Sequence, residues 1–289
     1  MAQLHIGISG WTYAAWRGTF YPTGLPHRRE LEYASQRMNS IEINGSFYSL
    51  QRPSSYRTWA EETPPDFVFA VKGGRFITHM KKLHDIRSPL ANFFASGVLL
   101  LGEKLGPILW QFPAQWGYDP ARFSSFLEQL PRTSEEASAL AEENTLVAPE
   151  RMWTRSLHSK PLRYAFEVRH PSFFVNDFTE LLRKHNAALV FADTAGTWPY
   201  AEDLTSDFVY IRLHGAEQLY ASGYTDEQLE WWAERIRAWR AGGEPADARR
   251  ITPEEITTSR ERDVYVYFDN DAKVHAPFDA IRLASRLQG

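Results

Sequence analysis

Eight short apolar segments recur along the chain, and this recurrence constrains the fold more than any other feature of the sequence. Each segment has the length of a β-strand and is rich in valine, isoleucine, phenylalanine and tyrosine. The segments are His5–Ser9, Ser40–Asn44, Phe67–Lys72, Pro107–Phe112, Tyr164–Arg169, Ala188–Asp193, Phe208–His214 and Val264–Asn270. Helical segments lie between them, and strands that alternate with helices favour a parallel sheet.

The predicted helices carry apolar residues three and four positions apart, which is the spacing of one helix face. They span Arg28–Met38, Ser54–Glu62, Leu90–Leu101, Arg122–Leu130, Phe178–His185, Asp226–Trp239 and Phe278–Leu287. Thr225 and Gln228 are spaced as a capping box at a helix start. Ser54 is expected to cap its own helix, and Pro277 suits a first helical turn.

The predicted fold class is α/β, a TIM-like (β/α)8 barrel, because eight parallel strands are the number that closes such a barrel. The 289 residues suit one domain over Met1–Gly289. Within it, residues 132–143 are expected to be a solvated helix end and residues 241–262 a surface loop or insertion. A doubly wound open sheet is the alternative, but no glycine-rich dinucleotide fingerprint follows a predicted strand.

Composition excludes several kinds of chemistry. The chain has no cysteine, so it has no disulfides, thiolate nucleophiles, iron–sulfur clusters or cysteine–zinc sites. A net charge of -4 argues against broad electrostatic binding to nucleic acid. Residues 1–10 do not have the pattern of a signal peptide, and the most apolar stretch, 97–101, is too short to span a bilayer. A cytoplasmic protein without a membrane partner is expected.

Charged side chains alternate with apolar ones near the ends of the predicted strands. Arg212 and His214, for example, alternate with Ile211 and Leu213, so the charged pair shares one strand face. The inward-facing charged residues at these strand ends are Glu42, Lys72, Glu167, Arg169, Asp193, Arg212, His214 and Asp269. In a barrel they would meet at the C-terminal mouth, where barrel enzymes place their active sites. The alternative interpretation is a structural ion-pair network that fills the barrel.

Seven motifs run from end to end and resemble those of one family. They are GWTYAAWRGTFYP, NSIEINGSFY, FVFAVKGGRFITHMKKL, GPILWQFP, FEVRHPSFF, YIRLHG and VYVYFDND. The chain resembles the YecE-like family of bacterial barrel proteins, catalogued as domain of unknown function number seventy-two. The resemblance implies a TIM-like barrel and implies no established reaction.

The charged residues suggest distinct roles. Lys72, Arg169 and Arg212 are expected to hold an anion, while Glu167 and Asp193 are the candidates for proton transfer. Lys72 has the alternatives of an ion pair or a Schiff base, and His214 can titrate near neutrality, ligate a metal or simply hydrogen-bond. The remaining predicted binding residues are Glu42, Asn44, Arg75, Gln111, Tyr267, Asp269, Asn270, Trp11 and Tyr13.

Two loops are expected to overhang the mouth. The basic loop Arg75–Asp85 can contact a phosphate or be merely solvated, and the glycines Gly73 and Gly74 before it would let backbone N–H groups approach an anion. The aromatic residues from Trp11 to Tyr21 can stack on a sugar or base, or cover the barrel rim.

These features predict an enzyme that applies acid/base chemistry to a small anionic ligand, phosphorylated or sugar-like. Hydrolase, isomerase and lyase activities stay open, and no cofactor is expected. One alternative is a metal-dependent phosphoesterase or nucleic-acid-processing barrel, disfavoured because the neighbouring lysine and arginines would repel a cation. Its ligands would be Glu42, Glu167, Asp193, His214 and Asp269. Another alternative is a non-catalytic binding or regulatory module. The sequence does not specify an oligomeric state.

Overall fold

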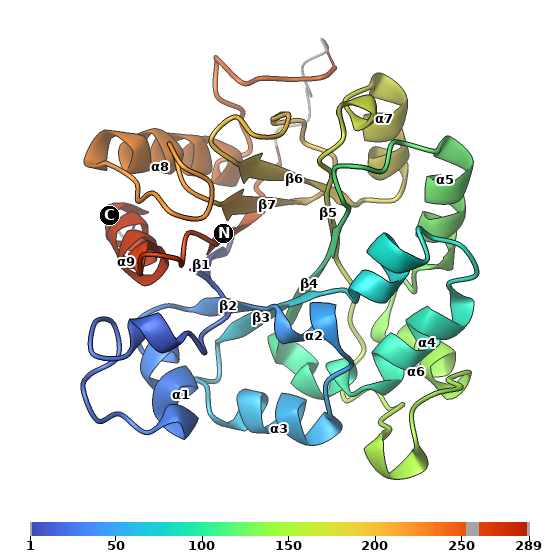
Figure 1. Cartoon of the computed structure of the whole chain (residues 1–289). Coiled ribbons are helices and arrows are strands. Elements are labelled where there is room, and N and C mark those ends of the chain that lie inside the picture. The colour runs from blue at the N-terminus through green and yellow to red at the C-terminus, as the bar shows by residue number, and fades with distance from the viewer. Residues whose placement is uncertain (1, 253–259, 288–289) are drawn as a thin grey trace. The chain divides into compact units, whose positions relative to one another are not determined.

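A computed structural model describes residues 2–252 and 260–287 of the chain. Eight strands follow one another in the order β1-β2-β3-β4-β5-β6-β7-β8, which is the order of a closed barrel (Figure 1). This order confirms the prediction of a TIM-like (β/α)8 fold. Contacts divide the chain into two compact units, and we call residues 1–42 with 171–289 the terminal unit and residues 43–170 the central unit. The single-domain expectation stays a prediction.

The terminal unit contains both ends of the chain. Its strands are β1 (Leu4–Ser9), the first three residues of β2 (Ser40–Ile43), β6 (Ala188–Asp193), β7 (Phe208–Leu213) and β8 (Asp263–Phe268). Its α-helices are α1 (Glu30–Ser35), α7 (Asn176–Lys184), α8 (Asp226–Arg240) and α9 (His275–Leu287). Parallel pairing joins β6 to β7, β7 to β8, β8 to β1 and β1 to β2. Helices α8 and α9 pack side by side, as Figure 1 shows in orange and red.

The central unit carries three strands in parallel order, β3 (Val68–Lys72), β4 (Leu105–Gln111) and β5 (Tyr164–Glu167). Its α-helices are α2 (Gly45–Tyr48), α3 (Pro53–Glu61), α4 (Arg87–Ala95), α5 (Pro120–Gln129) and α6 (Ser134–Glu142). A π-helix, η3 (Phe76–Met80), follows β3, and a 3₁₀ segment, η4 (Val98–Lys104), precedes β4. Short π-helices are rare and occur often at functional sites.

Strand alternation places aromatic residues against the helices. Trp110 on β4 is completely buried, with its ring 5.6 Å from that of Phe93 on α4 and 5.2 Å from that of Phe126 on α5. In the terminal unit, Trp239 of α8 packs on Phe191 of β6 with ring centres 5.1 Å apart. These aromatic side chains thus lie between strands and helices, where large apolar area is buried.

The first residues of three helices show which of the predicted capping interactions are present in the structure. The capping box of Thr225 and Gln228 is present at α8. The expectation that Ser54 caps its helix is wrong, because α3 begins at Pro53, whose fixed φ and missing N–H suit the first helical position. Residues 132–143 are also more than a helix end. They contain α6, with Thr133 as an N-cap that accepts a hydrogen bond from the Glu136 amide.

The expected surface loop at 241–262 is only partly described, because residues 253–259 lie outside the described residues. Its first part is tied to the terminal unit by two buried carboxylates. Glu202 accepts from the Arg249 amide at 2.8 Å, and Asp203 accepts from the Ile251 amide at 2.7 Å and the Thr252 hydroxyl at 2.6 Å. In the described ranges 2–252 and 260–287, no helix is long and apolar enough to cross a membrane.

Candidate functional site

A buried arginine at the end of β7 organises the charged residues of the terminal unit. Arg212 is completely buried and donates through Nη2 to Glu42 Oε1 at 2.9 Å and through Nε to Glu42 Oε2 at 3.1 Å. The same Nη2 donates to Asp269 Oδ2 at 2.8 Å. One guanidinium therefore faces two carboxylates. Such charge-assisted bonds offset part of the cost of burying the charges.

Neighbouring hydroxyl groups complete the environment of Glu42. Tyr210 donates to Glu42 Oε2 at 2.7 Å, and Ser9 donates to Glu42 Oε1 at 2.9 Å. The hydroxyl groups of Tyr267 and Ser40 lie 2.7 Å apart. These contacts agree with the strand alternation, which places Tyr210 on the same face as Arg212. They favour a structural role for Arg212 and Glu42, because the N–H groups of Arg212 donate to carboxylates of the protein itself.

A second group of acidic residues continues from β8 into the turn before α9. Nδ1 of His214 lies 3.1 Å from Asp269 Oδ2, and the side chain of Asp269 is partly exposed. Burial, and then the charge of Asp269, raise the pKa of Asp271 to about 6. Between them, Asn270 is completely buried and donates to Ser222 O at 2.9 Å and Asp279 Oδ2 at 3.0 Å. The Asn270 amide thus holds the turn.

Asp193 ends β6 and stabilises the turn that follows it. Its Oδ1 accepts from the Ala195 amide at 3.3 Å, which is an Asx-type bond, and its Oδ2 accepts from the Tyr224 hydroxyl at 3.0 Å. Burial raises the pKa of Asp193. A carboxyl with a raised pKa can carry a proton closer to neutrality than an ordinary aspartate.

The aromatic residues after β1 act mainly as a cover. Trp16, Phe20 and Tyr21 are buried, while Trp11 and Tyr13 are partly exposed. The Tyr13 hydroxyl donates to the Ser9 carbonyl, and burial raises the pKa of Tyr13 far above its usual value. The two partly exposed residues are the ones predicted as binding residues, and nothing in the described contacts assigns them a ligand.

The central unit brings Lys72, Glu167 and Arg169 to the ends of β3 and β5. The Lys72 side chain is buried, with Nζ 4.4 Å from the centre of the Phe47 ring, a cation–π contact. Arg169 donates through Nε to Glu167 Oε1 at 2.7 Å, and Nη2 lies 2.5 Å from the same oxygen. Glu167 is completely buried. The carboxylate therefore fixes the orientation of the Arg169 guanidinium.

A histidine on the π-helix lies among these cations. The Nδ1 atom of His79 is 2.8 Å from Thr78 Oγ1, and its Nε2 atom is 3.5 Å from Gln111 Nε2. Burial lowers the pKa of His79 to about 4, with further lowering by Lys72, Arg169 and Arg75. His79 is therefore neutral at pH 7. We call these residues the His79 cluster: Lys72, Arg75, His79, Gln111, Glu167 and Arg169.

Sequence reasoning placed His79 in the basic loop that can contact a phosphate and gave the residue no individual role. The only signal was its position soon after a strand that ends in lysine. Asn44, which was predicted to orient substrate, lies at the start of α2. Its Oδ1 atom is buried and has no hydrogen-bond donor among the described residues.

The glycines after β3 serve packing more than anion binding. The Gly73 amide donates to Leu109 O at 2.8 Å, so it does not offer the free N–H that the sequence suggested. A Cβ atom at Gly73 would lie 2.2 Å from the Trp110 ring, whereas one at Gly74 would lie 3.7 Å from its nearest neighbour. Gly73 is required because the strand end passes directly over Trp110. The expectation for Gly73 is thus wrong.

The acidic residues predicted as alternative metal ligands are spread over both units. Glu42, Asp193, His214 and Asp269 belong to the terminal unit and Glu167 to the central unit. Within either unit, among the described residues, no three His, Asp or Glu side chains are grouped so that they could hold a metal ion.

Comparison with known proteins identifies relatives along the whole chain. The model of a family described as "Protein of unknown function DUF72" matches residues 5–289. The UPF0759 protein YunF of Bacillus subtilis is 30% identical over 116 residues, covering 38% of this chain and 40% of YunF. The UPF0759 protein YecE of Escherichia coli K12 is 27% identical over 174 residues, covering 60% of this chain and 50% of YecE. The chain thus matches about half the length of these curated relatives or less.

Solved structures show the same fold. A DUF72 family protein of Thermotoga maritima superposes with a TM-score of 0.74 at 23% identity, covering 99% of this chain and 100% of that one. A DUF72 family protein of Enterococcus faecalis gives a TM-score of 0.69 at 14% identity, covering 99% and 96%. At these identities the likeness concerns the fold.

Proposed function

We propose, from the premise that this chain belongs to the DUF72 family of proteins of unknown function, that it is an enzyme for a small anionic substrate. The substrate binds at the His79 cluster of the central unit and reacts by acid/base chemistry. Its class is a phosphorylated or sugar-like small molecule. The family assignment supports the fold and leaves the reaction open, so the proposal depends on the chemistry of the side chains.

One observation carries the proposal: the His79 side chain lies among three cations, Lys72, Arg75 and Arg169, and burial together with these cations lowers its pKa. Lys72, Arg75 and Arg169 all lower its pKa, and among the main influences that come from the described residues Glu167 is the acidic group that raises it. Positive charge therefore exceeds negative charge around this imidazole. An anionic ligand would relieve that excess, and perturbed histidines in such surroundings are typical of functional sites.

The geometry gives each residue a distinct task. Arg169 is held by Glu167, and an oriented guanidinium is suited to bidentate contact with a phosphate or carboxylate. Lys72 supplies a point charge above the Phe47 ring. The contact of His79 Nδ1 with Thr78 fixes the ring orientation, so Nε2 can accept or donate a hydrogen bond at the substrate. In this arrangement Glu167 is a positioning residue.

The terminal unit contains a carboxyl group of its own with a perturbed pKa. Asp269 is paired with Arg212, whereas the pKa of its neighbour Asp271 is raised to about 6. Environments that separate two carboxyl groups in this way are typical of acid and base pairs. We therefore propose that Asp271 exchanges a proton near neutral pH within the terminal unit, separately from the His79 cluster. Sequence reasoning missed it because Asp271 lies beyond the predicted strand.

Isothermal titration calorimetry with inorganic phosphate and with glucose 6-phosphate tests the binding step. The wild-type protein should bind at least one of them, and Lys72→Met or Arg75→Gln should weaken binding by about tenfold or more. The matched control is Arg155→Gln, since Arg155 is an exposed arginine of the same unit. Equal binding by the Arg75→Gln and Arg155→Gln proteins, or no binding by the wild type, would overturn the proposal.

Turnover separates an enzyme from a binding module. If the ligand binds, then His79→Gln should lower its conversion far more than its affinity, because a glutamine side chain cannot exchange a proton near neutrality. Conversion is followed by phosphorus NMR over a long incubation of phosphorylated sugars. Binding without conversion of any of them by the wild type would favour the non-catalytic module.

A further inference from the structure

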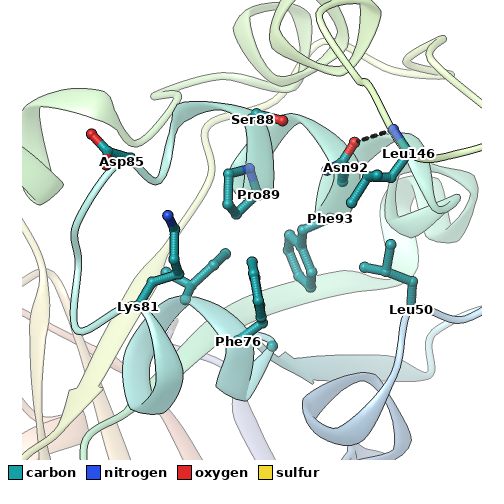
Figure 2. Close-up of a pocket in the computed structure, with 11 residues that line it drawn as sticks. Leu50, Phe76, Lys81, Asp85, Ser88, Pro89, Asn92, Phe93 and Leu146 are labelled. Carbon is teal, nitrogen blue, oxygen red and sulfur yellow. Dashed lines mark hydrogen bonds between the residues drawn. The ribbon is translucent and has the colours of Figure 1, made fainter.

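The central unit has an open cavity of about 380 Å³ beside the His79 cluster's π-helix, and the proposed function makes no use of it. Figure 2 shows that the cavity lies between η3, the start of α4 and the segments that carry Leu50 and Leu146. Its apolar walls are formed by Leu50, Phe76, Ile77, Pro89, Phe93 and Leu146. Small-molecule sites are typically concave, mostly apolar and about 300–1,000 Å³ in volume.

Three of these apolar side chains are exposed although they surround a hollow. Phe76 is 45% exposed, Leu146 is 76% exposed and Leu50 is 39% exposed. Single exposed apolar residues are common, but several around one cavity mark a surface that binds something. The apolar surface around the cavity is therefore exposed to water at a place where a bound ligand can cover it.

A buried amide holds the most exposed of these residues in place. Asn92 on α4 accepts hydrogen bonds through Oδ1 from the backbone amides of Thr145 at 2.9 Å and Leu146 at 3.2 Å. Ser88 and Thr145 also share a hydrogen bond of 2.7 Å. The segment with Leu146 is thus anchored to α4 by polar contacts, and the position of Leu146 over the cavity is built into the fold.

One ammonium group gives the cavity a charge preference. The Lys81 side chain has no ion pair with any residue in the part of the chain that the structure describes. In Figure 2 the Lys81 side chain rises beside the apolar groups, and Asp85, which also lines the cavity, lies farther from Phe76 and Phe93 than Lys81 does. A negatively charged group on a ligand would therefore meet Lys81 at the rim.

The aromatic walls favour a flat ligand. Among the described residues, the ring of Phe76 has no aromatic neighbour, while Phe93 is already 5.6 Å from Trp110. A cavity of roughly 150 Å³ holds one benzene molecule. The volume of about 380 Å³ accordingly accommodates two fused rings with a carboxylate. We propose that this cavity is a binding site for a small aromatic carboxylate, with the rings against Phe76 and Phe93 and the carboxylate at Lys81.

Fluorescence and calorimetric titration with 2-naphthoate tests the proposal, with the neutral 2-naphthamide as the probe for charge. We expect 2-naphthoate to bind more tightly than the amide. Lys81→Gln should weaken naphthoate binding by about tenfold and change amide binding less than about twofold. The matched control is Lys82→Gln, since Lys82 is the next residue and does not line the cavity.

The apolar contact is tested by Leu146→Asp, which should weaken both probes by about tenfold or more because it places a charge over the cavity. Leu157→Asp is its control, since Leu157 is also exposed, at 49%, and lies outside the cavity. Both substitutions are at exposed positions. Thermal melting of the two variants is the control for folding, and their melting temperatures should be equal.

Several outcomes would overturn the proposal. They are the absence of naphthoate binding at millimolar concentration, equal binding of acid and amide, and equal effects of the Leu146 and Leu157 substitutions. Sedimentation velocity gives another: a dimer that Leu146→Asp dissociates would show that a second copy covers the cavity. Phosphate affinity, measured on the same variants, should stay unchanged, so failure here is distinguishable from failure of the proposed function.

Discussion

The guanidinium of Arg212 spans both oxygens of Glu42, at 2.9 and 3.1 Å, and neither side chain is exposed to solvent. This pairing joins the end of β7 to the end of β2 within the terminal unit. The same guanidinium nitrogen that reaches Glu42 also reaches Asp269. The chain therefore holds a buried cation between two buried or partly buried anions, and its removal has predictable effects on stability.

We expect Arg212→Met to destabilise the protein by about 3–5 kcal/mol, because it leaves two carboxylates without their cation. Glu42→Gln should cost less, about 1–3 kcal/mol, since Asp269 still balances Arg212. Urea denaturation measures both values. If Arg212→Met and the wild type had the same midpoint of urea denaturation, this result would contradict the structural role of the network.

Asp271 predicts a distinct pH dependence of stability. Its folded pKa of about 6 lies above the ordinary aspartate value of 3.8, so the folded state binds more protons between these pH values. The free energy of unfolding should therefore fall as pH rises from about 4 to 6, by about 1–2 kcal/mol after allowance for partial exposure. Asp271→Asn should remove this loss and be more stable than the wild type at pH 8. Denaturation at pH 4 and pH 8 tests it, and a less stable variant at pH 8 is the contrary result.

The pKa of His79 in the central unit should change when a neighbouring cation is removed. Its pKa of about 4 should rise toward 6.5 in Lys72→Met and in Arg75→Gln, because each change removes a positive charge that opposes protonation. Arg155→Gln should leave it unchanged. Two-dimensional NMR of the His79 ring protons over pH 3–8 gives the value directly. An identical titration in all four proteins would show that burial alone sets the pKa.

Adjacent glycines should differ sharply in their tolerance of a methyl group. Gly73→Ala would place Cβ 2.2 Å from the Trp110 ring, so we expect a loss of about 2 kcal/mol or more. Gly74→Ala, whose nearest neighbour is at 3.7 Å, should change stability by less than about 1 kcal/mol. Thermal denaturation compares the stability of the two variants. Similar melting temperatures would contradict the close approach of the Gly73 backbone to the Trp110 ring.

The order of strands was predictable because each strand is a short apolar run and most of the runs are separated by a helix, although none lies between β6 and β7. Strand alternation also placed Tyr210 and Arg212 on one face, and their shared bonds to Glu42 agree with it. The start of α3 was misjudged because a proline at the first position outweighs a serine cap one residue later. Helix α6 was hidden because its buried face consists mainly of small residues, with Leu140 as the one large apolar side chain.

The site was less predictable than the fold because its properties depend on burial and on contacts between distant segments. His79 looked like one more basic residue of a loop, and only the π-helix brings it under the influence of Lys72 and Arg169. Asp271 likewise gains its raised pKa from burial beside Asp269. Neither effect leaves a signature in local sequence, since titration depends on the surroundings of a group in the folded chain.

The most direct test of the anion site is the pKa of His79 measured by NMR with and without saturating phosphate. An anion bound among Lys72, Arg75 and Arg169 offsets the charges that lower this pKa. We predict that phosphate raises it by about one unit or more in the wild type and by clearly less in Arg75→Gln. An unchanged His79 titration at phosphate concentrations that saturate the protein by calorimetry would contradict the account.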